Sequence, residues 1–450
     1  MEINMKLSRT IVASAVALSM LSMSAATQAT GFYKYFKPNN FEETDFVGGV
    51  YAMSNDFGAN TIVAYGRNDD GTLELINSFR TGGQGAAFDG GEGLDPLISA
   101  NSVIITDDRE HILAVNAGSN TVSVFKINPD FSLKLTDVER VYGVGPNSIT
   151  YSNGLVYVST IDADGDFAGE PDQEGALTGY RLSDKGRLTP IRRSVRLLDN
   201  RPSAVQFSPD GRFLVASSIN AGSVALASDS QDEIVVYEVN RDGSLSGSPV
   251  SAATSTLRDN EENRNLPSAI GFDIVQDNAK QYIVVTEARE FQADGTPPAF
   301  DALQTGSVST WELGRFGELT AISQDVMTGS DQFDGERTAC WIEFSHDESL
   351  FWVSNALEST LSTFTFSDGV VELSEQVTAA GAGPVDGDPF GTTDGWIDLW
   401  ASDDGEYVYQ LFGLSGAIGV FETGEDGSLT LIQTASGNLP DANTQGIVAF

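Results

Sequence analysis

One unit of four short strands recurs along the chain, and this repeat limits the fold more than any other feature of the sequence. The stretch 203–248 contains the unit whole: an apolar strand, the acidic turn SPDG, a second strand, a loop, the third strand IVVYEV, the turn NRDGS and a fourth strand that begins with Leu. Turns of the Asp-Gly type favour tight hairpins because glycine tolerates a positive φ. Four-stranded antiparallel units repeated in this way predict the blades of a β-propeller.

The two ends of the chain predict how the ring of blades closes. Six complete units follow one another, and two incomplete pieces remain. The front supplies three strands, GGVYAMSN, TIVAYGR and LELINSF, while the chain stops at the apolar segment QGIVAF. We expect these pieces to form one shared blade, with the last segment as its innermost strand. The sequence therefore predicts an all-β, seven-bladed propeller with four antiparallel strands per blade, formed as a single domain by residues 30–450.

Residues 1–29 have the layout of a secretory signal peptide. Lys6 and Arg9 precede an apolar run that starts at Ile11, and small residues follow as far as Ala26 or Ala29. The apolar run is too short for a stable membrane span. The chain has one cysteine, so it forms no internal disulfide. We expect a periplasmic or secreted bacterial protein.

The charge of the chain excludes two classes of partner. The sequence contains 64 Asp and Glu against 25 Lys and Arg, a formal net charge of −39. Nucleic acids and anionic membranes are polyanions and would be repelled. A dense carboxylate surface is typical of proteins from salty water, where screening limits self-repulsion. We expect a monomer that binds a small-molecule or carbohydrate ligand.

The long insertions are predicted to lie on one face of the propeller. Turns between first and second strands, and between third and fourth strands, are uniformly short and share one face. Loops between second and third strands, and connections between blades, share the other face. Every long segment belongs to this second class: 80–97, 162–175, 220–232, 255–267, 288–306, 329–339 and 379–395. Long loops on a rigid scaffold commonly carry function, so we expect the site on this long-loop face, at the mouth of the central channel. Drifted surface insertions are the alternative.

Cys340 and His346 are close in sequence and raise the question of a catalytic pair. Cys340 begins a first strand at the long-loop face, whereas His346 falls in the short turn at the other end of that strand. Six residues of extended strand separate them by roughly 20 Å. A nucleophile and its base must be within hydrogen-bond reach, so the two residues are not a dyad. His111 is predicted to lie in another short turn, which also excludes a Ser-His-Asp triad at the channel mouth.

Polar residues at the starts of the first strands are candidate ligands of a metal ion. The residues expected at the channel mouth are Asn101, Asn147, Ser203, Ser268, Cys340 and Ile397, with Asp398 beside the last. Oxygen atoms of Asn101, Asn147 and Asp398 are the kind that Ca²⁺ prefers. A water-filled, hydrogen-bonded channel lining is the alternative. The segment 162–174 has the first three aspartates of a calcium loop but fails the EF-hand pattern at Phe167 and Gln173.

Glu287 and Arg289 are the candidate catalytic residues, because they stand where a second strand enters the longest loop. A Glu–Arg couple can supply a general base and an anion clamp for a carboxylate or lactone substrate. An ordinary surface ion pair is the alternative. The candidate substrate-binding residues are Asn147, Arg201, Arg337, Cys340 and Trp341.

The repeat units, such as PSAVQFSPDGRFLVAS and GWIDLWASDDGEYVY, resemble those of the seven-bladed lactonase-like propellers, the family of bacterial 6-phosphogluconolactonase and fungal carboxymuconate lactonizing enzyme. The resemblance covers essentially all of the chain after residue 29. Within the family the chain is similar to a secreted subgroup with an ACW motif, here Ala339-Cys340-Trp341. The family's enzymes carry Arg-His early in a first strand and Asn-Glu at the end of the next strand. Of these, Glu287 alone is matched, and Cys340-Trp341 replaces Arg-His.

Two functions from different classes follow from these observations. The resemblance implies an exported enzyme of lactonase type that opens or forms the lactone ring of a small carboxylate or sugar-derived substrate at the long-loop face. The missing Arg-His pair favours a non-catalytic secreted propeller that binds a polysaccharide, peptide or cell-surface partner through the same loops. A propeller fold hosts both kinds of function.

Overall fold

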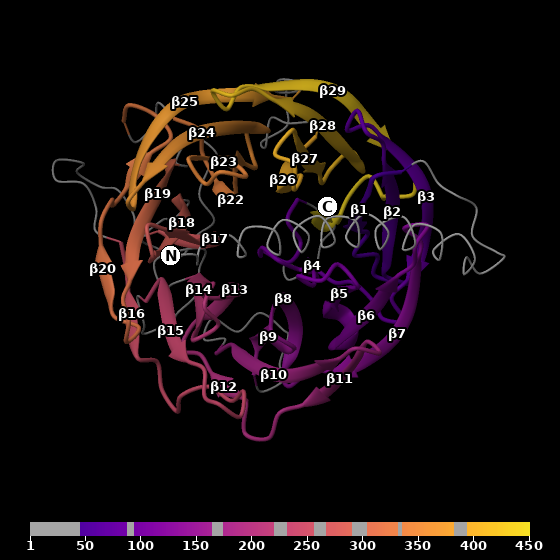
Figure 1. The fold of residues 1–450 in the computed structure, drawn as a ribbon, viewed down its shortest axis with the longest axis vertical. Coiled ribbons are helices and arrows are strands. Elements are labelled where there is room, and N and C mark those ends of the chain that lie inside the picture. Colours follow the sequence, from indigo (N-terminus) through magenta and orange to yellow (C-terminus); the bar gives the residue numbers. More distant parts are fainter. Residues whose placement is uncertain are drawn as a thin grey trace, which may run out of the picture. The chain divides into compact units, whose positions relative to one another are not determined.

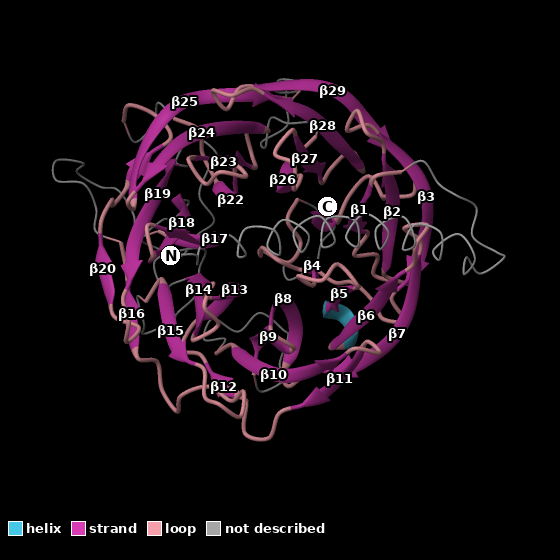
Figure 2. Cartoon of the chain, viewed as in Figure 1, coloured by secondary structure: helices cyan, strands magenta, loops and turns pink. Residues whose placement is uncertain are grey.

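The structure is a computed structural model that describes residues 46–87, 94–163, 174–219, 232–255, 267–289, 304–331, 335–381 and 394–450. The chain divides into two units, Met1–Asp45 and Phe46–Phe450, and the described residues all belong to the second. The predicted signal peptide and most of the long loops therefore lie outside the described residues. Within the described ranges there is no α-helix, only the 3₁₀ turn η1 (Ala117–Ser119), and no helix that could span a membrane (Figure 2).

The described strands pair into six hydrogen-bonded sheets, all of them antiparallel. Three sheets come from the first part of the chain and its end. The first contains β1 (Gly48–Met53), β2 (Thr61–Arg67), β3 (Leu73–Arg80) and β30 (Gln445–Ala449); the second contains β4 (Val103–Ile105), β5 (His111–Asn116), β6 (Thr121–Ile127) and β7 (Leu133–Arg140); the third contains β8 (Val144–Ser152), β9 (Leu155–Asp162), β10 (Ala176–Ser183), β11 (Arg187–Pro190) and β12 (Arg196–Leu197).

The remaining three sheets follow in chain order. The nine-stranded sheet contains β13 (Arg201–Phe207), β14 (Phe213–Ile219), β15 (Ile234–Glu238), β16 (Ser251–Ala253), β17 (Ser268–Asp277), β18 (Lys280–Arg289), β19 (Gln304–Leu313), β20 (Leu319–Ala321) and β21 (Val326–Met327); the next contains β22 (Ala339–Phe344), β23 (Leu350–Asn355), β24 (Thr360–Ser367) and β25 (Val370–Ala380); the last contains β26 (Trp396–Ala401), β27 (Tyr407–Phe412), β28 (Ala417–Thr423) and β29 (Leu429–Ser436). The nine-stranded sheet is two successive hairpin runs, joined where Ile219 of β14 pairs with Ser268 of β17.

The acidic turns have the local geometry that the repeat predicts. In SPDG, Asp210 accepts hydrogen bonds from the Ser208 hydroxyl at 2.8 Å and from the Arg212 amide at 3.1 Å. Gly211 has a φ of 67°, a conformation that costs glycine little because it lacks a Cβ. The aspartate and the glycine together reverse the chain between β13 and β14.

The strands that begin each run lie nearest a common centre, and the fourth strands form the rim of the unit (Figure 1). Contacts between inner strands run from β4 to β8, β13, β17, β22, β26 and β30, and from β30 back to β4. The last strand, β30, also pairs with β1, with Tyr51 opposite Val448. The two ends of the described unit therefore close the cycle, as the incomplete end pieces predict.

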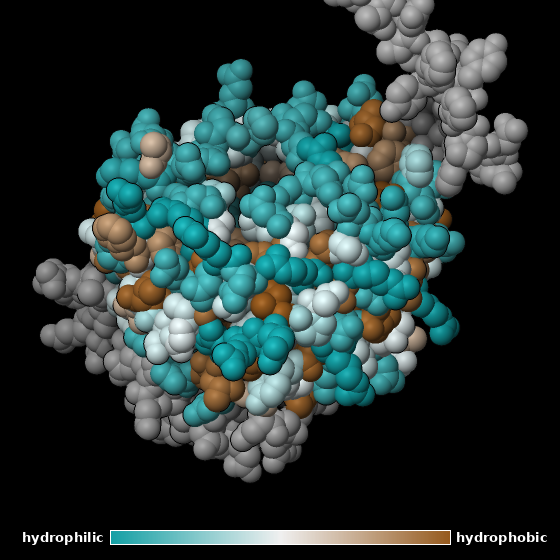
Figure 3. All heavy atoms as spheres, turned by 60° about the horizontal axis from the view of Figure 1, so that its bottom comes forward, coloured by the Kyte–Doolittle hydropathy of each residue, from teal (hydrophilic) through white to brown (hydrophobic). Residues whose placement is uncertain are grey.

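The core lies between neighbouring sheets. β1 and β2 are buried on both faces, whereas the rim strand β3 buries only Leu73 and is otherwise partly or fully exposed. Aromatic pairs such as Trp396 and Phe412, with ring centroids 5.1 Å apart, fill the space between strands. On the face shown in Figure 3, hydrophilic residues predominate and apolar ones occur in small separate groups. Both observations agree with a hydrated surface over an apolar core between the sheets.

Candidate active site

Glu287 and Arg289 lie at the end of β18, two residues apart, so their side chains point to the same side of the strand. Both side chains are 0% exposed. Arg289 Nη2 contacts Glu287 Oε2 at 2.8 Å. The pair is therefore buried and is not the ordinary surface ion pair that the sequence left open as the alternative. Burying an ion pair is costly unless further hydrogen bonds satisfy both partners, so the surroundings of this pair decide its role.

Two residues missed by the sequence analysis complete the environment of Arg289. Its Nη2 also contacts Asp325 Oδ1 at 3.1 Å, and its Nε donates to Ser307 Oγ at 3.1 Å. The Ser307 hydroxyl in turn donates to Glu287 Oε2. Asp325 is held in a left-handed conformation with a φ of 51°, and its amide donates to Ser309 Oγ at 2.9 Å. The guanidinium is thus fixed by three groups from different segments.

A third buried carboxyl, Glu233, belongs to the same cluster. Glu233 directly precedes β15, and its backbone is fixed by hydrogen bonds to Ala253 and Ser218, each of 2.9 Å. Its Oε2 accepts from the Ser255 amide at 2.7 Å. Burial, and after it the negative charge of Glu287, raise the pKa of Glu233 well above its ordinary value. The site therefore combines a carboxyl that favours the neutral form with a carboxylate paired to arginine.

The pairing of strands explains why residues more than fifty positions apart meet here. Ile219 pairs with Ser268, Ser268 pairs with Ala288, and this places the ends of β14, β17 and β18 side by side. Glu233 and Arg289 each adjoin a long loop that lies outside the described residues. The cluster consequently stands at the base of the long loops rather than on the axis of the propeller.

The segment 94–102, which precedes β4, crosses the predicted channel mouth. The carbonyl oxygen of Ser99 accepts from Trp341 Nε1 at 3.1 Å and from Gln445 Nε2 at 2.8 Å. The Ser99 hydroxyl donates to the carbonyl oxygen of Asn147 at 3.0 Å. Ser99 thereby links β22, β30 and β8. The segment 94–102 therefore lies against the starts of all three strands.

Three residues of the segment 94–102 have a left-handed backbone conformation. Asp95, Ile98 and Asn101 have φ values of 48°, 47° and 60°, in the left-handed region that non-glycine residues seldom occupy. For the β-branched Ile98 the conformation is costly. The buried side chain of Leu97 and the hydrogen bonds of Ser99 offset this strain.

Two of the three predicted metal ligands, Asn147 and Asp398, have side chains that hydrogen-bond within the protein. Asn147 donates to the carbonyl oxygen of Pro202 at 2.8 Å and accepts from Ser159 Oγ at 2.7 Å. Asp398 accepts from the amides of Leu399 at 3.1 Å and Ile447 at 3.4 Å, and burial raises its pKa to about 7. Within the described part of the chain, no three His, Cys, Asp or Glu side chains are grouped to hold a metal ion. A Ca²⁺ site at Asn101, Asn147 and Asp398 stays a prediction, and two aspartates of the failed calcium loop lie outside the described residues.

The other predicted substrate-binding residues are distributed around the cluster. Cys340 is buried, and its carbonyl oxygen accepts from Thr286 Oγ1 at 2.7 Å, so the start of β22 lies against the strand end that carries Glu287. Arg337 forms an ion pair with Glu358. Arg201 is buried at the start of β13. The structure thus brings Cys340 near the cluster, while Trp341 and Asn147 meet at Ser99.

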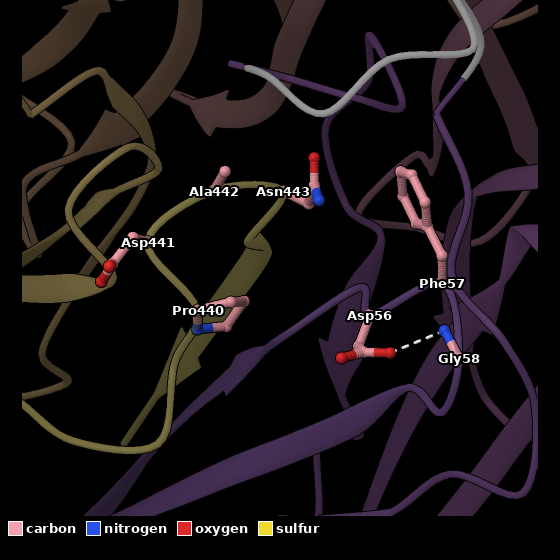
Figure 4. Close-up of a pocket in the computed structure, with 7 residues that line it drawn as sticks. All are labelled: Asp56, Phe57, Gly58, Pro440, Asp441, Ala442 and Asn443. Atoms are coloured by element: carbon pink, nitrogen blue, oxygen red, sulfur yellow. Dashed lines mark hydrogen bonds between the residues drawn. The ribbon is translucent and has the colours of Figure 1, made fainter.

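Two cavities elsewhere in the described unit are alternative candidate sites. One, of about 360 Å³, lies between the β1–β2 loop and the β29–β30 connection (Figure 4). Its Asp56 accepts from the amides of Gly58 and Ala59 at 2.6 and 2.9 Å, which is the geometry of a local turn. The other, of about 270 Å³, is lined by Asn101, Ile104, Gln206, Trp400 and residues of the short turns. Neither contains the pairing of acid, carboxylate and cation found at Glu233, Glu287 and Arg289.

The chain matches no model of a protein family and no curated protein. Several solved structures are similar to it at low identity. A Bacteroides uniformis protein provisionally named a 6-phosphogluconolactonase superposes with a TM-score of 0.60 and 15% identity, over 90% of this chain and 100% of that chain. A Bacteroides fragilis protein with the same provisional name gives a TM-score of 0.55 and 14% identity, over 90% and 100%.

A third similar structure is the periplasmic gluconolactonase of Pseudomonas aeruginosa. It superposes with a TM-score of 0.52 and 19% identity, over 72% of this chain and 82% of that chain. Similarity at such low identity concerns the backbone arrangement and leaves the reaction open. The described unit therefore has the β-propeller fold of lactonase-like proteins.

Proposed function

We propose that the chain is an exported hydrolase of lactonase type, with Glu287 as general base and Arg289 as the group that stabilises negative charge. The observation that carries the proposal is the fully buried pair itself, with Arg289 Nη2 2.8 Å from Glu287 Oε2 at the base of the long loops. A buried, preorganised cation is worth far more to a developing oxyanion than one in water. Structural ion pairs seldom gain stability from such burial, which favours a functional reason for this one.

We also propose that the propeller has seven blades and that the ring is closed by both ends of the chain. The closed cycle of inner strands supports this count, with the nine-stranded sheet taken as two blades. The pairing of β30 with β1 supports the closure. Export rests on the predicted signal peptide in residues 1–29.

The reaction would consume one water and release a hydroxy acid. Glu287 accepts a proton from water as the water oxygen attacks the lactone carbonyl carbon. Negative charge then develops on the carbonyl oxygen, where Arg289 can stabilise it. The bond between the carbonyl carbon and the ring oxygen breaks, and the ring oxygen takes up a proton. General base catalysis of this kind contributes about 10²–10⁴-fold.

An uncharged lactone is the substrate class that the charges favour. The carboxyls of Glu233, Glu287 and Asp325 surround one guanidinium within the described residues, and Arg337 is already paired with Glu358. An incoming carboxylate or phosphate would have to compete with these groups for the arginines. One of the similar structures is named a periplasmic gluconolactonase, which supports an unphosphorylated aldonolactone.

The non-catalytic binding propeller is the second candidate, because one observation favours it. Both Glu287 and Arg289 are completely buried, and Ser99 of the segment 94–102 is hydrogen-bonded to Trp341 and Gln445 at the starts of two inner strands. A site that admits no substrate would leave only the outer surface of the loops for a polysaccharide, peptide or cell-surface partner. Turnover separates the two candidates.

The test is a screen of unphosphorylated aldonolactones and muconolactones, with acid release followed at constant pH and the spontaneous rate subtracted. Wild type is compared with Glu287→Gln and with Glu358→Gln, which alters a different arginine-paired carboxyl on the same face. Turnover that Glu287→Gln abolishes and Glu358→Gln retains supports the enzyme. Absence of turnover above the Glu287→Gln rate with every lactone would reject it in favour of the binding protein.

A further inference from the structure

We propose that Glu233 and Glu287 form a carboxyl dyad that holds one proton between them, with Glu233 as the general acid of the site. The catalytic half of this inference rests on the proposed lactonase function, whereas the sharing of the proton does not. Glu233 belongs to the hairpin run that precedes the one carrying Glu287. The repeat pattern therefore gives no reason to associate the two residues.

The hydrogen bonds of the two carboxyl groups leave one oxygen of each for the other. Glu233 Oε2 accepts from the Ser255 amide, and Glu287 Oε2 is occupied by Arg289 and Ser307. Glu233 Oε1 and Glu287 Oε1 are both buried and have no other partner among the described residues. The charge of Glu287 and a hydrogen bond to it both contribute to the raised pKa of Glu233, so the two carboxyl groups are neighbours. A hydrogen bond between two carboxyl groups requires a proton on one of them.

The surroundings assign the proton to Glu233. Glu287 contacts the guanidinium of Arg289 at 2.8 Å. Glu233 receives one hydrogen bond from a neutral amide, and burial raises its pKa. The charged groups facing the dyad from the packed elements are Arg289 on β18 and Asp325 before β21. Arg289 contacts Asp325 as well as Glu287, so its one positive charge is shared between two carboxyls. The remaining negative charge favours retention of the proton on Glu233.

This arrangement supplies the two proton transfers that ring opening needs. Glu287 takes the proton of the attacking water, and Glu233 gives its proton to the ring oxygen as the carbon–oxygen bond breaks. The proton then returns from Glu287 to Glu233 through their shared hydrogen bond, and the dyad is restored. Enzymes commonly use two carboxyl groups in this way, when one environment favours the protonated form and the other favours the ionised form.

The proton itself is tested without any substrate. A protonated carboxyl has an infrared C=O stretching band that a carboxylate lacks, and the band shifts in D₂O. We expect this band in wild type at pH 7 and a decrease in its intensity in Glu233→Gln, with Glu312→Gln, a partly exposed carboxyl on β19, as the control. Asp398, whose pKa burial raises to about 7, contributes to the band that remains. A spectrum in which Glu233→Gln removes carboxylate absorption instead would overturn the dyad.

Stability gives a second readout of the same proton. Folded wild type keeps the proton of Glu233 at pH values where the unfolded chain, with its ordinary pKa of 4.5, has lost it. The wild-type folding equilibrium constant should therefore fall relative to that of Glu233→Gln by up to tenfold per pH unit as the pH rises above 4.5. A constant ratio between pH 5 and 8 contradicts proton retention. If Glu233→Gln does not fold, Glu233→Asp and the wild-type infrared spectrum replace it.

Activity then separates the dyad from the proposed function. The dyad predicts that Glu233→Gln lowers kcat at least 100-fold and removes the alkaline limb of the pH–rate profile, and that Glu233→Asp restores part of both. Full activity of Glu233→Gln beside an inactive Glu287→Gln would overturn the acid role of Glu233 and leave the lactonase proposal standing. Full activity of Glu287→Gln would overturn the lactonase proposal itself, whatever the infrared spectrum shows.

Discussion

The indole N–H of Trp341 donates to the carbonyl oxygen of Ser99 at 3.1 Å, across 242 positions of the sequence. This bond joins the start of β22 to the segment 94–102 in front of β4. Gln445, from the last strand, donates to the same oxygen at 2.8 Å. The carbonyl oxygen of Ser99 thus connects the segment before β4 to the starts of β22 and β30.

Replacing Trp341 with Phe should loosen the segment 94–102. The substitution removes one hydrogen bond and part of a buried ring, at a cost of about 2 kcal/mol in the free energy of unfolding. Amide hydrogen exchange of residues 95–102 should become faster. The control is Trp352→Phe, which removes a similar indole bond, to Gly427 at 2.9 Å, far from this segment. Equal exchange of residues 95–102 in both variants would contradict the role given to Trp341.

Replacing Asp398 with Asn should flatten the pH dependence of stability. Burial raises the pKa of Asp398 from 3.8 to about 7, so the folded state keeps a proton that the unfolded chain loses. Wild-type stability should therefore fall as the pH rises from about 4 to 7, by at most about 1.4 kcal/mol per pH unit. Urea unfolding at several pH values measures the slope. The prediction fails if Asp398→Asn and wild type have parallel curves.

Replacing Arg289 with Met should strongly destabilise the protein. The change leaves the buried carboxyls of Glu287 and Asp325 without their cation, which costs about 3–5 kcal/mol in the free energy of unfolding. Arg337→Met, which breaks the partly exposed pair with Glu358, is the matched control and should cost less. Urea unfolding measures both penalties, and a penalty for Arg289→Met no larger than that for Arg337→Met would contradict a charged, buried cluster.

Salt should stabilise the chain. At a formal net charge of −39, screening weakens the repulsion that opposes folding. The melting temperature should be higher in 1 M NaCl or KCl than in dilute buffer. A gain of about 1–2 kcal/mol in the free energy of unfolding corresponds to a rise of several degrees. Equal melting curves in NaCl and KCl would identify charge screening as the cause of the stabilisation. A melting temperature that is unchanged by salt would contradict a surface dominated by repulsion.

The calcium prediction is tested by the same melting experiment. A site at Asn101, Asn147 and Asp398 predicts that Ca²⁺ raises the melting temperature beyond the effect of NaCl at equal ionic strength, and that EDTA reverses it. Asp398→Asn should abolish the response. Insensitivity to both Ca²⁺ and EDTA would reject the site.

The sequence predicted the strands, the pairing of β30 with β1 and the position of Glu287 and Arg289 at the end of a second strand, because each of these depends on local pattern or on the repeat. Glu233 was missed, since its approach to Glu287 depends on the pairing of Ile219 with Ser268 between two repeat units. The segment 94–102 was missed for another reason. A connection between blades and a segment that crosses the channel have the same polar, glycine-containing composition, and only tertiary hydrogen bonds such as that of Ser99 distinguish them.

The most direct test of the account is the initial rate of ring opening of an unphosphorylated aldonolactone at pH 7 by wild type and by Glu287→Gln. The account predicts a wild-type rate above the spontaneous reaction and a loss of at least 100-fold in kcat in the variant, with the fold unchanged by circular dichroism. Equal rates for the two proteins, or no rate above the spontaneous reaction in either, would contradict it.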